Sequence, residues 1–141
     1  SPEYLWYHPL PEGLPILGRV AAGTPILAEE NIQGYATIER LFGRDKGTFL
    51  LRVSGDSMVD EGIVDGDFVV VKTASTVDNG QIAIVLLDDE ATVKRVFFQK
   101  DRIALKPANR KAGYKTRYVK QFDKDARILG KVIGCIRTVI A

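Results

Sequence analysis

The segment Ser54-Gly55-Asp56-Ser57-Met58 is the first part of the sequence whose residue types could support chemistry. A serine acts as a nucleophile from a tight, exposed turn, where its hydroxyl projects and nearby backbone N–H groups can face an oxyanion. Glycine and aspartate directly before Ser57 are typical of such a turn. The same residue types dominate ordinary turns, so this segment alone leaves a plain turn open as the alternative.

A serine nucleophile needs a base, and the only histidine does not suit the role. His8 lies within residues 1–15, a stretch rich in proline and aromatic residues that we interpret as an extended linker. An exposed linker histidine is the plainer interpretation of His8. A Ser–His–Asp triad is therefore not expected, and the base should be a lysine.

Lys94 is the best candidate for that base. Strand alternation in the apolar segment 91–99 places Lys94 on the same face as Val96 and Phe98. Partial desolvation there would lower the pKa of the amine, and a neutral amine could take the proton of a serine. The alternative is an ordinary strand lysine that extends to solvent.

The remaining reactive side chains favour structural roles. Asp65-Gly66-Asp67 is typical of a turn whose carboxylates bind backbone N–H groups. Cys135 alternates with apolar neighbours, which predicts a buried, inert thiol. One cysteine forms no internal disulfide, and with one histidine it makes no zinc site. We expect neither a metal nor a cofactor.

The composition is that of a soluble globular domain. The chain has 141 residues, 45% hydrophobic and 27% charged, which fits one domain with its own core. Its formal charge of +2, from 20 basic and 18 acidic residues, predicts no broad basic face for binding DNA. The single cysteine indicates a reducing cytoplasm. No apolar run approaches the ~18–20 residues that a membrane span needs.

Short strand-like segments separated by polar turns predict a mostly-β, compact single domain over residues 16–141. Residues 16–25 predict a strand followed by a narrow loop, and residues 35–42 a short helix or turn. The Asp88-Asp89-Glu90 turn suggests a hairpin between its flanking strands. The predicted later strands are 48–53, 68–72, 81–87, 91–99, 102–106 and, over 127–140, two or more strands broken at Gly130 and Gly134.

Three segments together resemble the LexA, UmuD and phage-repressor family of self-cleaving proteins. They are Val20-Ala21-Ala22-Gly23, the Ser57 segment already quoted, and Ala91-Thr92-Val93-Lys94-Arg95. Their separations also fit the family, because Ala22 precedes Ser57 by 35 positions and Lys94 follows it by 37. The stretch 60–71 is similar to the segment that follows the family's nucleophile. The resemblance covers residues 14–141.

The resemblance implies the fold and the site residues. The fold would be the LexA and signal-peptidase-like one, a compact mostly-β domain of short, strongly bent strands. Ser57 would be the nucleophile, Lys94 the general base, and Ala22–Gly23 the scissile bond in a cleavage loop that includes Val20 and Ala21. The backbone N–H groups of Ser57 and Met58 would be the oxyanion donors. An Ala–Gly site is typical of LexA or a phage repressor, whereas UmuD typically has Cys–Gly.

The resemblance also implies a role and partners. The expected role is that of the C-terminal autoproteolytic and dimerisation domain of an SOS-response repressor. An activated RecA filament on single-stranded DNA would favour the docked position of a loop that moves between docked and undocked positions. Operator DNA would be bound only by an N-terminal winged helix-turn-helix domain, for which this sequence has no segment. The alternatives are a phage repressor domain, a catalytically silent dimerisation module, and a signal-peptidase-like enzyme acting in trans.

Overall fold

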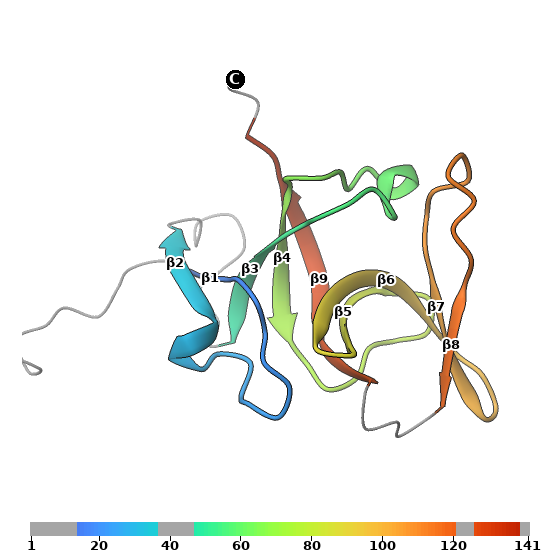
Figure 1. The fold of residues 1–141 in the computed structure, drawn as a ribbon, viewed down its shortest axis with the longest axis horizontal. Coiled ribbons are helices and arrows are strands. Elements are labelled where there is room, and N and C mark those ends of the chain that lie inside the picture. The colour runs from blue at the N-terminus through green and yellow to red at the C-terminus, as the bar shows by residue number, and fades with distance from the viewer. Residues whose placement is uncertain (1–13, 37–46, 121–125, 139–141) are drawn as a thin grey trace, which may run out of the picture.

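The computed structural model describes residues 14–36, 47–120 and 126–138. Within these residues, nine strands form one mixed sheet in the order β2-β1-β3-β4-β9-β5-β6-β7-β8 (Figure 1). This confirms the mostly-β single domain. The strands are β1 (Leu14–Leu17), β2 (Ile32–Ala36), β3 (Thr48–Arg52), β4 (Phe68–Thr73), β5 (Ile82–Leu87), β6 (Glu90–Phe98), β7 (Arg102–Lys106), β8 (Arg117–Lys120) and β9 (Ala126–Ile136), with short 3₁₀ helices η1 (Glu29–Asn31) and η2 (Val59–Glu61).

The strands β3 to β7 lie where the sequence predicts them, to within one residue at most ends. The hairpin between β5 and β6 is also confirmed, and its turn has Asp88 and Asp89 at φ of 49° and 69°. Two consecutive left-handed residues match the right-handed twist of the flanking strands, and aspartate tolerates that conformation well. This hairpin sets the register that places Lys94 opposite Ala83.

The prediction of two or more strands over 127–140 was wrong, because β9 runs unbroken from Ala126 to Ile136 between β4 and β5. Its pairing with both neighbours shifts register near Gly130 and Gly134, so the glycines mark bulges that bend the strand without ending it. A Cβ on Gly130 would lie 2.4 Å from Val71 Cγ1 and 2.7 Å from the Lys72 carbonyl oxygen. Close approach of β4 therefore requires glycine here.

Three other expectations need correction at the edges of the sheet. Tyr35 and Ala36 belong to β2 and not to a helix or turn, and the rest of that predicted segment lies outside the described residues. β8 was not predicted. β1 begins at Leu14, inside the expected linker, because the Leu14 side chain is buried against Leu50 and Val70. The remainder of the linker, with His8, lies outside the described residues.

β5 is buried on both of its faces, and with β6 it forms a strongly arched part of the sheet (Figure 1). Ile84 and Leu86 of β5 belong to the main core with Leu17, Phe49 and others, whereas Ala83 and Val85 pack in a second cluster. Successive side chains on a strand point to opposite faces, so one apolar strand supplies both clusters. None of the helices in the described residues is long and apolar enough to cross a membrane.

Candidate active site around Ser57

Ser57 lies in a long loop between β3 and β4, which we call the Ser57 loop (residues 53–67). The loop is closed at its base by hydrogen bonds from the Val53 N–H to the Asp67 carbonyl (2.7 Å) and from the Gly66 N–H to the Val53 carbonyl (2.8 Å). Asp65 Oδ1 accepts a hydrogen bond from the Gly55 N–H at 2.7 Å, as expected for a turn carboxylate. The loop is thus a fixed support for Ser57.

Met58 anchors this loop in the protein interior. Its side chain is only 1% exposed and belongs to the main core. Its carbonyl accepts hydrogen bonds from the N–H groups of Glu61 (3.0 Å) and Ile63 (3.3 Å). Because Met58 is held on the inner side, the preceding Ser57 is half-buried at the surface, with its hydroxyl turned toward β6.

Lys94 extends from β6 to the Ser57 hydroxyl. Its Nζ lies 2.9 Å from Ser57 Oγ, 2.9 Å from Thr92 Oγ1 and 3.0 Å from the Val93 carbonyl oxygen. Burial lowers the pKa of Lys94, because removal of water disfavours the ammonium; Glu90 opposes this shift. A neutral amine has two N–H donors and one lone pair, so Thr92 and Val93 can accept the two donors and leave the lone pair for Ser57.

The backbone around Ser57 leaves two N–H groups available. Within the described residues, the N–H groups of Ser57 and Met58 donate no hydrogen bond. The carbonyl group of Ser57, in contrast, is held by the β7–β8 connection. The Ala108 N–H donates to the Ser57 carbonyl at 2.6 Å, and the Asp60 N–H donates to the Ala108 carbonyl at 2.7 Å. This contact with Ala108 is not predictable from the sequence, because nothing in the residue types at 107–109 indicates chemistry.

A groove of about 610 Å³ adjoins the Ser57 loop. Asp60 and Glu61 form one wall, and Arg95 and Phe97 of β6 form another. Arg95 Nη2 pairs with Glu61 Oε1 at 2.7 Å and so ties η2 to the strand that carries Lys94. In the described residues, no three His, Cys, Asp or Glu side chains are grouped in a way that could hold a metal ion.

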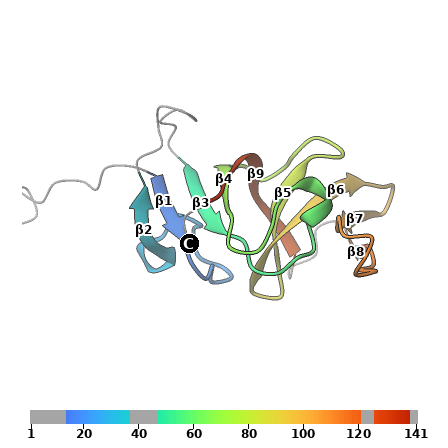
Figure 2. The same cartoon turned by 90° about the horizontal axis from the view of Figure 1, so that it is seen from above.

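The segment with the expected scissile bond does not contact Ser57. Val20 is buried in the main core, but Ala21, Ala22 and Gly23 are exposed, and Gly23 turns with a φ of 79°. We call residues 18–28 the small-residue loop. In Figures 1 and 2 this loop (blue) lies apart from η2.

Hydrogen bonds hold the small-residue loop in this position. The buried Asn31 accepts from the Ala21 N–H (3.3 Å) and donates through Nδ2 to the carbonyls of Pro25 (3.1 Å) and Ile26 (3.0 Å). Arg127 Nη2 donates to the Thr24 carbonyl at 3.0 Å. The structure therefore brings Ser57 and Lys94 together and keeps Ala22 and Gly23 away from them.

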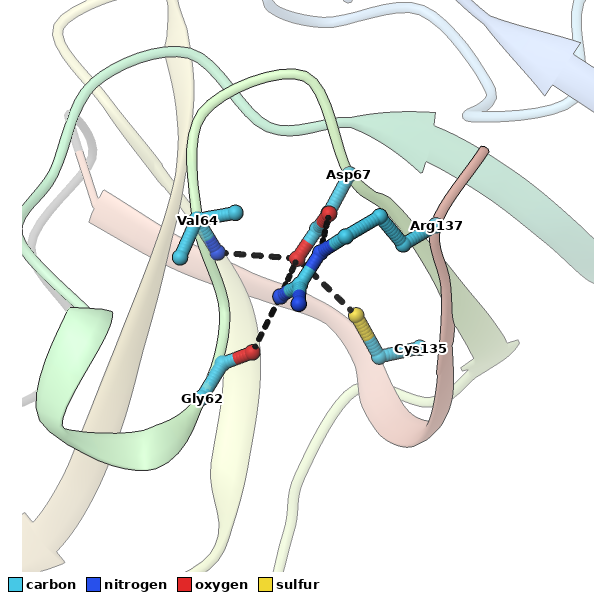
Figure 3. Close-up of polar contacts among 5 residues, drawn as sticks. All are labelled: Gly62, Val64, Asp67, Cys135 and Arg137. Carbon is cyan, nitrogen blue, oxygen red and sulfur yellow. Dashed lines mark hydrogen bonds and ion pairs between the residues drawn. The ribbon is translucent and has the colours of Figure 1, made fainter. Parts of the chain in front are cut away.

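A second polar cluster lies at the end of the Ser57 loop that leads into β4 (Figure 3). Asp67 is 1% exposed, and its carboxylate accepts hydrogen bonds from Arg137 Nε (2.8 Å) and Nη2 (2.9 Å) and from the Val64 N–H (2.8 Å). The Arg137 hydrogen bonds hold the pKa of Asp67 well below its usual range, against the opposing effect of burial. Arg137 Nη2 also donates to the Gly62 carbonyl at 2.9 Å.

Cys135 belongs to this cluster, and the expectation that it is buried was wrong. It is exposed on β9, where it pairs with Val69 of β4 next to a shift of register, and Figure 3 shows its side chain directed toward Asp67. The thiol donates to Asp67 Oδ2 at 3.4 Å. Partial desolvation, followed by the hydrogen bond to the carboxylate, raises the pKa of Cys135 to about 11. The thiol is therefore protonated, and unreactive as a nucleophile, near neutral pH.

Comparison with known proteins identifies relatives over most of the chain. It is 48% identical over 124 residues to a LexA repressor of Caldicellulosiruptor saccharolyticus, which covers 88% of this chain and 58% of that protein. LexA repressors of Anaeromyxobacter dehalogenans (44% over 126 residues; 88% of this chain, 54% of that protein) and Leptospira biflexa (46% over 126 residues; 89% and 59%) are similar. The chain thus spans somewhat more than half the length of these relatives.

The peptidase S24-like family matches residues 15–133, which include every strand from β2 to β8 and the loop that carries Ser57. The match spans most of the chain and agrees with the resemblance found from its motifs. The chain belongs to the peptidase S24-like family and is similar to LexA repressors.

Proposed function

We propose that this chain is the self-cleaving domain of a LexA-type repressor, with Ser57 as nucleophile, Lys94 as general base and Ala22–Gly23 as the bond that is cut. The observation that supports this most is the 2.9 Å contact between Lys94 Nζ and Ser57 Oγ, together with a lowered pKa for that lysine. Among the described residues, no other base contacts the Ser57 hydroxyl.

The proposed reaction needs only these side chains, two backbone N–H groups and one water molecule. Lys94 takes the Ser57 proton as Oγ attacks the Ala22 carbonyl carbon, and the N–H groups of Ser57 and Met58 stabilise the oxyanion. The bond to the Gly23 nitrogen then breaks, and that nitrogen receives the proton from Lys94. Water, deprotonated by Lys94, hydrolyses the ester between Ser57 and Ala22, which yields a carboxylate and restores the hydroxyl.

Self-cleavage requires the small-residue loop to leave its observed position. Ala22 and Gly23 are slender enough to enter a narrow site, and their exposure leaves them free of core packing. The loop would thus exchange between an undocked form, as in this structure, and a docked form that reaches Ser57. Docking would also bury Lys94 further and lower its pKa again. The rate of cleavage then depends on the population of the docked form.

The similarity to proteins named LexA repressors supports a proposal for the cellular role. We propose that cleavage inactivates a transcriptional repressor during the SOS response to DNA damage in a bacterial cytoplasm. An activated RecA filament on single-stranded DNA would favour the docked form without supplying catalytic groups. The domain would also form a homodimer, and operator DNA would be bound by another domain of the whole protein.

The test is to incubate the pure chain at alkaline pH and identify the products by mass spectrometry. Cleavage is expected between Ala22 and Gly23, and Ser57→Ala or Lys94→Ala should abolish it. Thr92→Ala is a milder variant for comparison, because it removes one hydrogen-bond acceptor of the Lys94 amine and keeps both reacting groups. Cleavage at that bond in both the Ser57→Ala and Lys94→Ala chains would refute the mechanism.

A catalytically silent dimerisation module is the second candidate, and the exposed, undocked position of Ala22–Gly23 is the observation that favours it. Such a module would sediment as a dimer and remain intact at alkaline pH. Both candidates predict a dimer, so the cleavage assay separates them, and analytical ultracentrifugation of the same samples tests the dimer that both require.

A further inference from the structure

The loop between β7 and β8, which we call the β7–β8 loop (residues 107–116), lies beside the Ser57 loop in both views (Figures 1 and 2). We infer that Asn109, within this loop, is a positioning residue: its side-chain amide fixes the peptide group between Asp56 and Ser57 and thereby aims the Ser57 N–H at the reacting carbonyl. This inference rests on the proposed function, because it concerns the oxyanion donors of that reaction.

Asn109 is one of the few buried polar residues described. It is 8% exposed, and both ends of its amide are used. Nδ2 donates to the Asp56 carbonyl at 2.8 Å, and Oδ1 accepts from the Ala112 N–H at 3.1 Å. The second contact locks the side chain within its own loop, so the first is made by a group that has little freedom to move.

A peptide group is planar, and its C=O and N–H point in opposite directions. The carbonyl of Asp56 and the N–H of Ser57 belong to the same peptide group. A hydrogen bond that holds the Asp56 carbonyl toward Asn109 therefore holds the Ser57 N–H pointing away from Asn109. Within the described residues that N–H has no acceptor of its own. The Asp56 carbonyl also accepts from the Val59 N–H, but at 3.4 Å, so the 2.8 Å bond from Asn109 is the shorter of the two that orient this peptide group.

The next peptide group is held in the same way. The Ala108 N–H donates to the Ser57 carbonyl at 2.6 Å, which fixes the plane that contains the Met58 N–H. Two consecutive residues of the β7–β8 loop thus orient two consecutive peptide groups of the Ser57 loop. Their N–H groups are the two proposed oxyanion donors. Donors that are oriented in advance stabilise a developing oxyanion without reorganising during the reaction.

Tyr114 supplies a matched control from the same loop. Its hydroxyl donates to Asp56 Oδ1 at 2.6 Å, so it binds the side chain of Asp56 and not the peptide group. Tyr114→Phe removes a hydrogen bond between the same two loops but leaves the Asp56 carbonyl with Asn109. If cohesion of the loops were all that mattered, this variant and an Asn109 variant would behave alike.

The test compares Asn109→Asp, Asn109→Ala and Tyr114→Phe with the unsubstituted chain. Asn109→Asp keeps the shape and the acceptor for the Ala112 N–H and loses the donor to Asp56, whereas Asn109→Ala adds no charge. Self-cleavage is followed across alkaline pH, and labelling of Ser57 by a fluorophosphonate probe is followed in parallel. Circular dichroism establishes that each variant is folded.

Both Asn109 variants should lower the maximum rates of cleavage and labelling by at least about tenfold, within the roughly 10²–10³-fold cost of losing an oxyanion donor itself. The midpoint of the pH profile should stay unchanged in Asn109→Ala, because Lys94 is not contacted by Asn109. Tyr114→Phe should change either rate by less than about threefold, since the Tyr114 hydroxyl binds the exposed carboxylate of Asp56 and neither of the two peptide groups.

Three results would overturn the inference. They are wild-type rates in folded Asn109 variants, equal losses in Tyr114→Phe, and slower cleavage with normal labelling, which would assign Asn109 to loop docking instead. Failure of the proposed function is distinguishable: the unsubstituted chain would then show neither cleavage nor labelling that Ser57→Ala abolishes.

Discussion

Arg127 Nη2 donates a hydrogen bond to the Thr24 carbonyl at 3.0 Å and so ties the small-residue loop to the beginning of β9. Thr24 follows Gly23, so this bond must break when the loop moves to Ser57. Arg127→Ala should therefore shift the population toward the docked form. We expect self-cleavage about two- to threefold faster, as the loss of one exposed hydrogen bond allows.

Arg117→Ala is the control for that prediction. Arg117 also is exposed and pairs with Asp88 at 2.9 Å, but on the β5–β6 hairpin and not on the small-residue loop. Its removal should leave the cleavage rate unchanged at the same pH. Slower cleavage in Arg127→Ala, with Arg117→Ala normal, would mean that Arg127 serves the docked form instead.

The pH dependence of self-cleavage should follow the pKa of Lys94. Burial lowers that pKa, so the neutral amine is present at a lower pH than for an ordinary lysine, whose pKa is about 10.4. The rate should rise as one proton is lost and level off below that value. Lys94→Arg should be inactive at every pH, because a guanidinium stays protonated. A profile that still rises steeply above the ordinary lysine pKa would contradict this assignment.

Much of the β-strand pattern was predictable, because strands such as β4 and β5 are short apolar runs bounded by turn residues. The insertion of β9 between β4 and β5 was not, since strand order depends on pairing across the whole chain. The bulges in β9 were not predictable for the same reason, because they too depend on pairing with neighbouring strands. A glycine that ends a strand and one that bends it look alike in sequence, and only the nearness of Val71 to Gly130 distinguishes them.

The residues of the candidate site that belong to sequence motifs were predictable. A residue that acts only by binding the backbone was not. Ser57 and Lys94 were paired from motif resemblance, and strand alternation alone would have left Lys94 free to extend to solvent. Asn109 acts through one side-chain amide on a peptide group, and an asparagine two positions after a proline in a loop is an ordinary turn residue. Nothing in its type or spacing separates it from Asn79, which is exposed.

The ion pair between Asp67 and Arg137 should make the free energy of unfolding decrease at acidic pH. The folded pKa of Asp67 is lowered, so its contribution is fully present above the ordinary aspartate pKa of about 3.9 and is lost as the pH falls below it. At neutral pH, Asp67→Asn should lower the free energy of unfolding by about 1–2 kcal/mol, the lower range for a bond to a charged group, because Arg137 is half exposed.

Asp65→Asn is the matched substitution for Asp67→Asn, since Asp65 also binds a backbone N–H but is exposed. Urea unfolding of both variants and of the Ser57→Ala parent, which avoids cleavage, gives the comparison. The difference between parent and Asp67→Asn should shrink at pH 3 relative to pH 7. A difference that stays constant would show that the carboxylate charge is not what stabilises this end of the Ser57 loop.

Gly130 should be among the least replaceable residues of the sheet. A Cβ there would lie 2.4 Å from Val71 Cγ1 and 2.7 Å from the Lys72 carbonyl oxygen, and the latter is backbone that cannot rotate away. Gly130→Ala should cost about 1–3 kcal/mol of stability through overpacking and strand displacement. Gly34→Ala in β2 is the control, because among the described residues nothing besides its own chain neighbours lies within 4 Å of the added Cβ. Since alanine is easier to order than glycine, Gly34→Ala should be neutral or slightly stabilising in urea unfolding. Equal stability of the two variants would contradict this prediction, because it would mean that β4 and β9 can move apart at Gly130 without cost, although Gly130 and the two residues after it pair in regular register with β4.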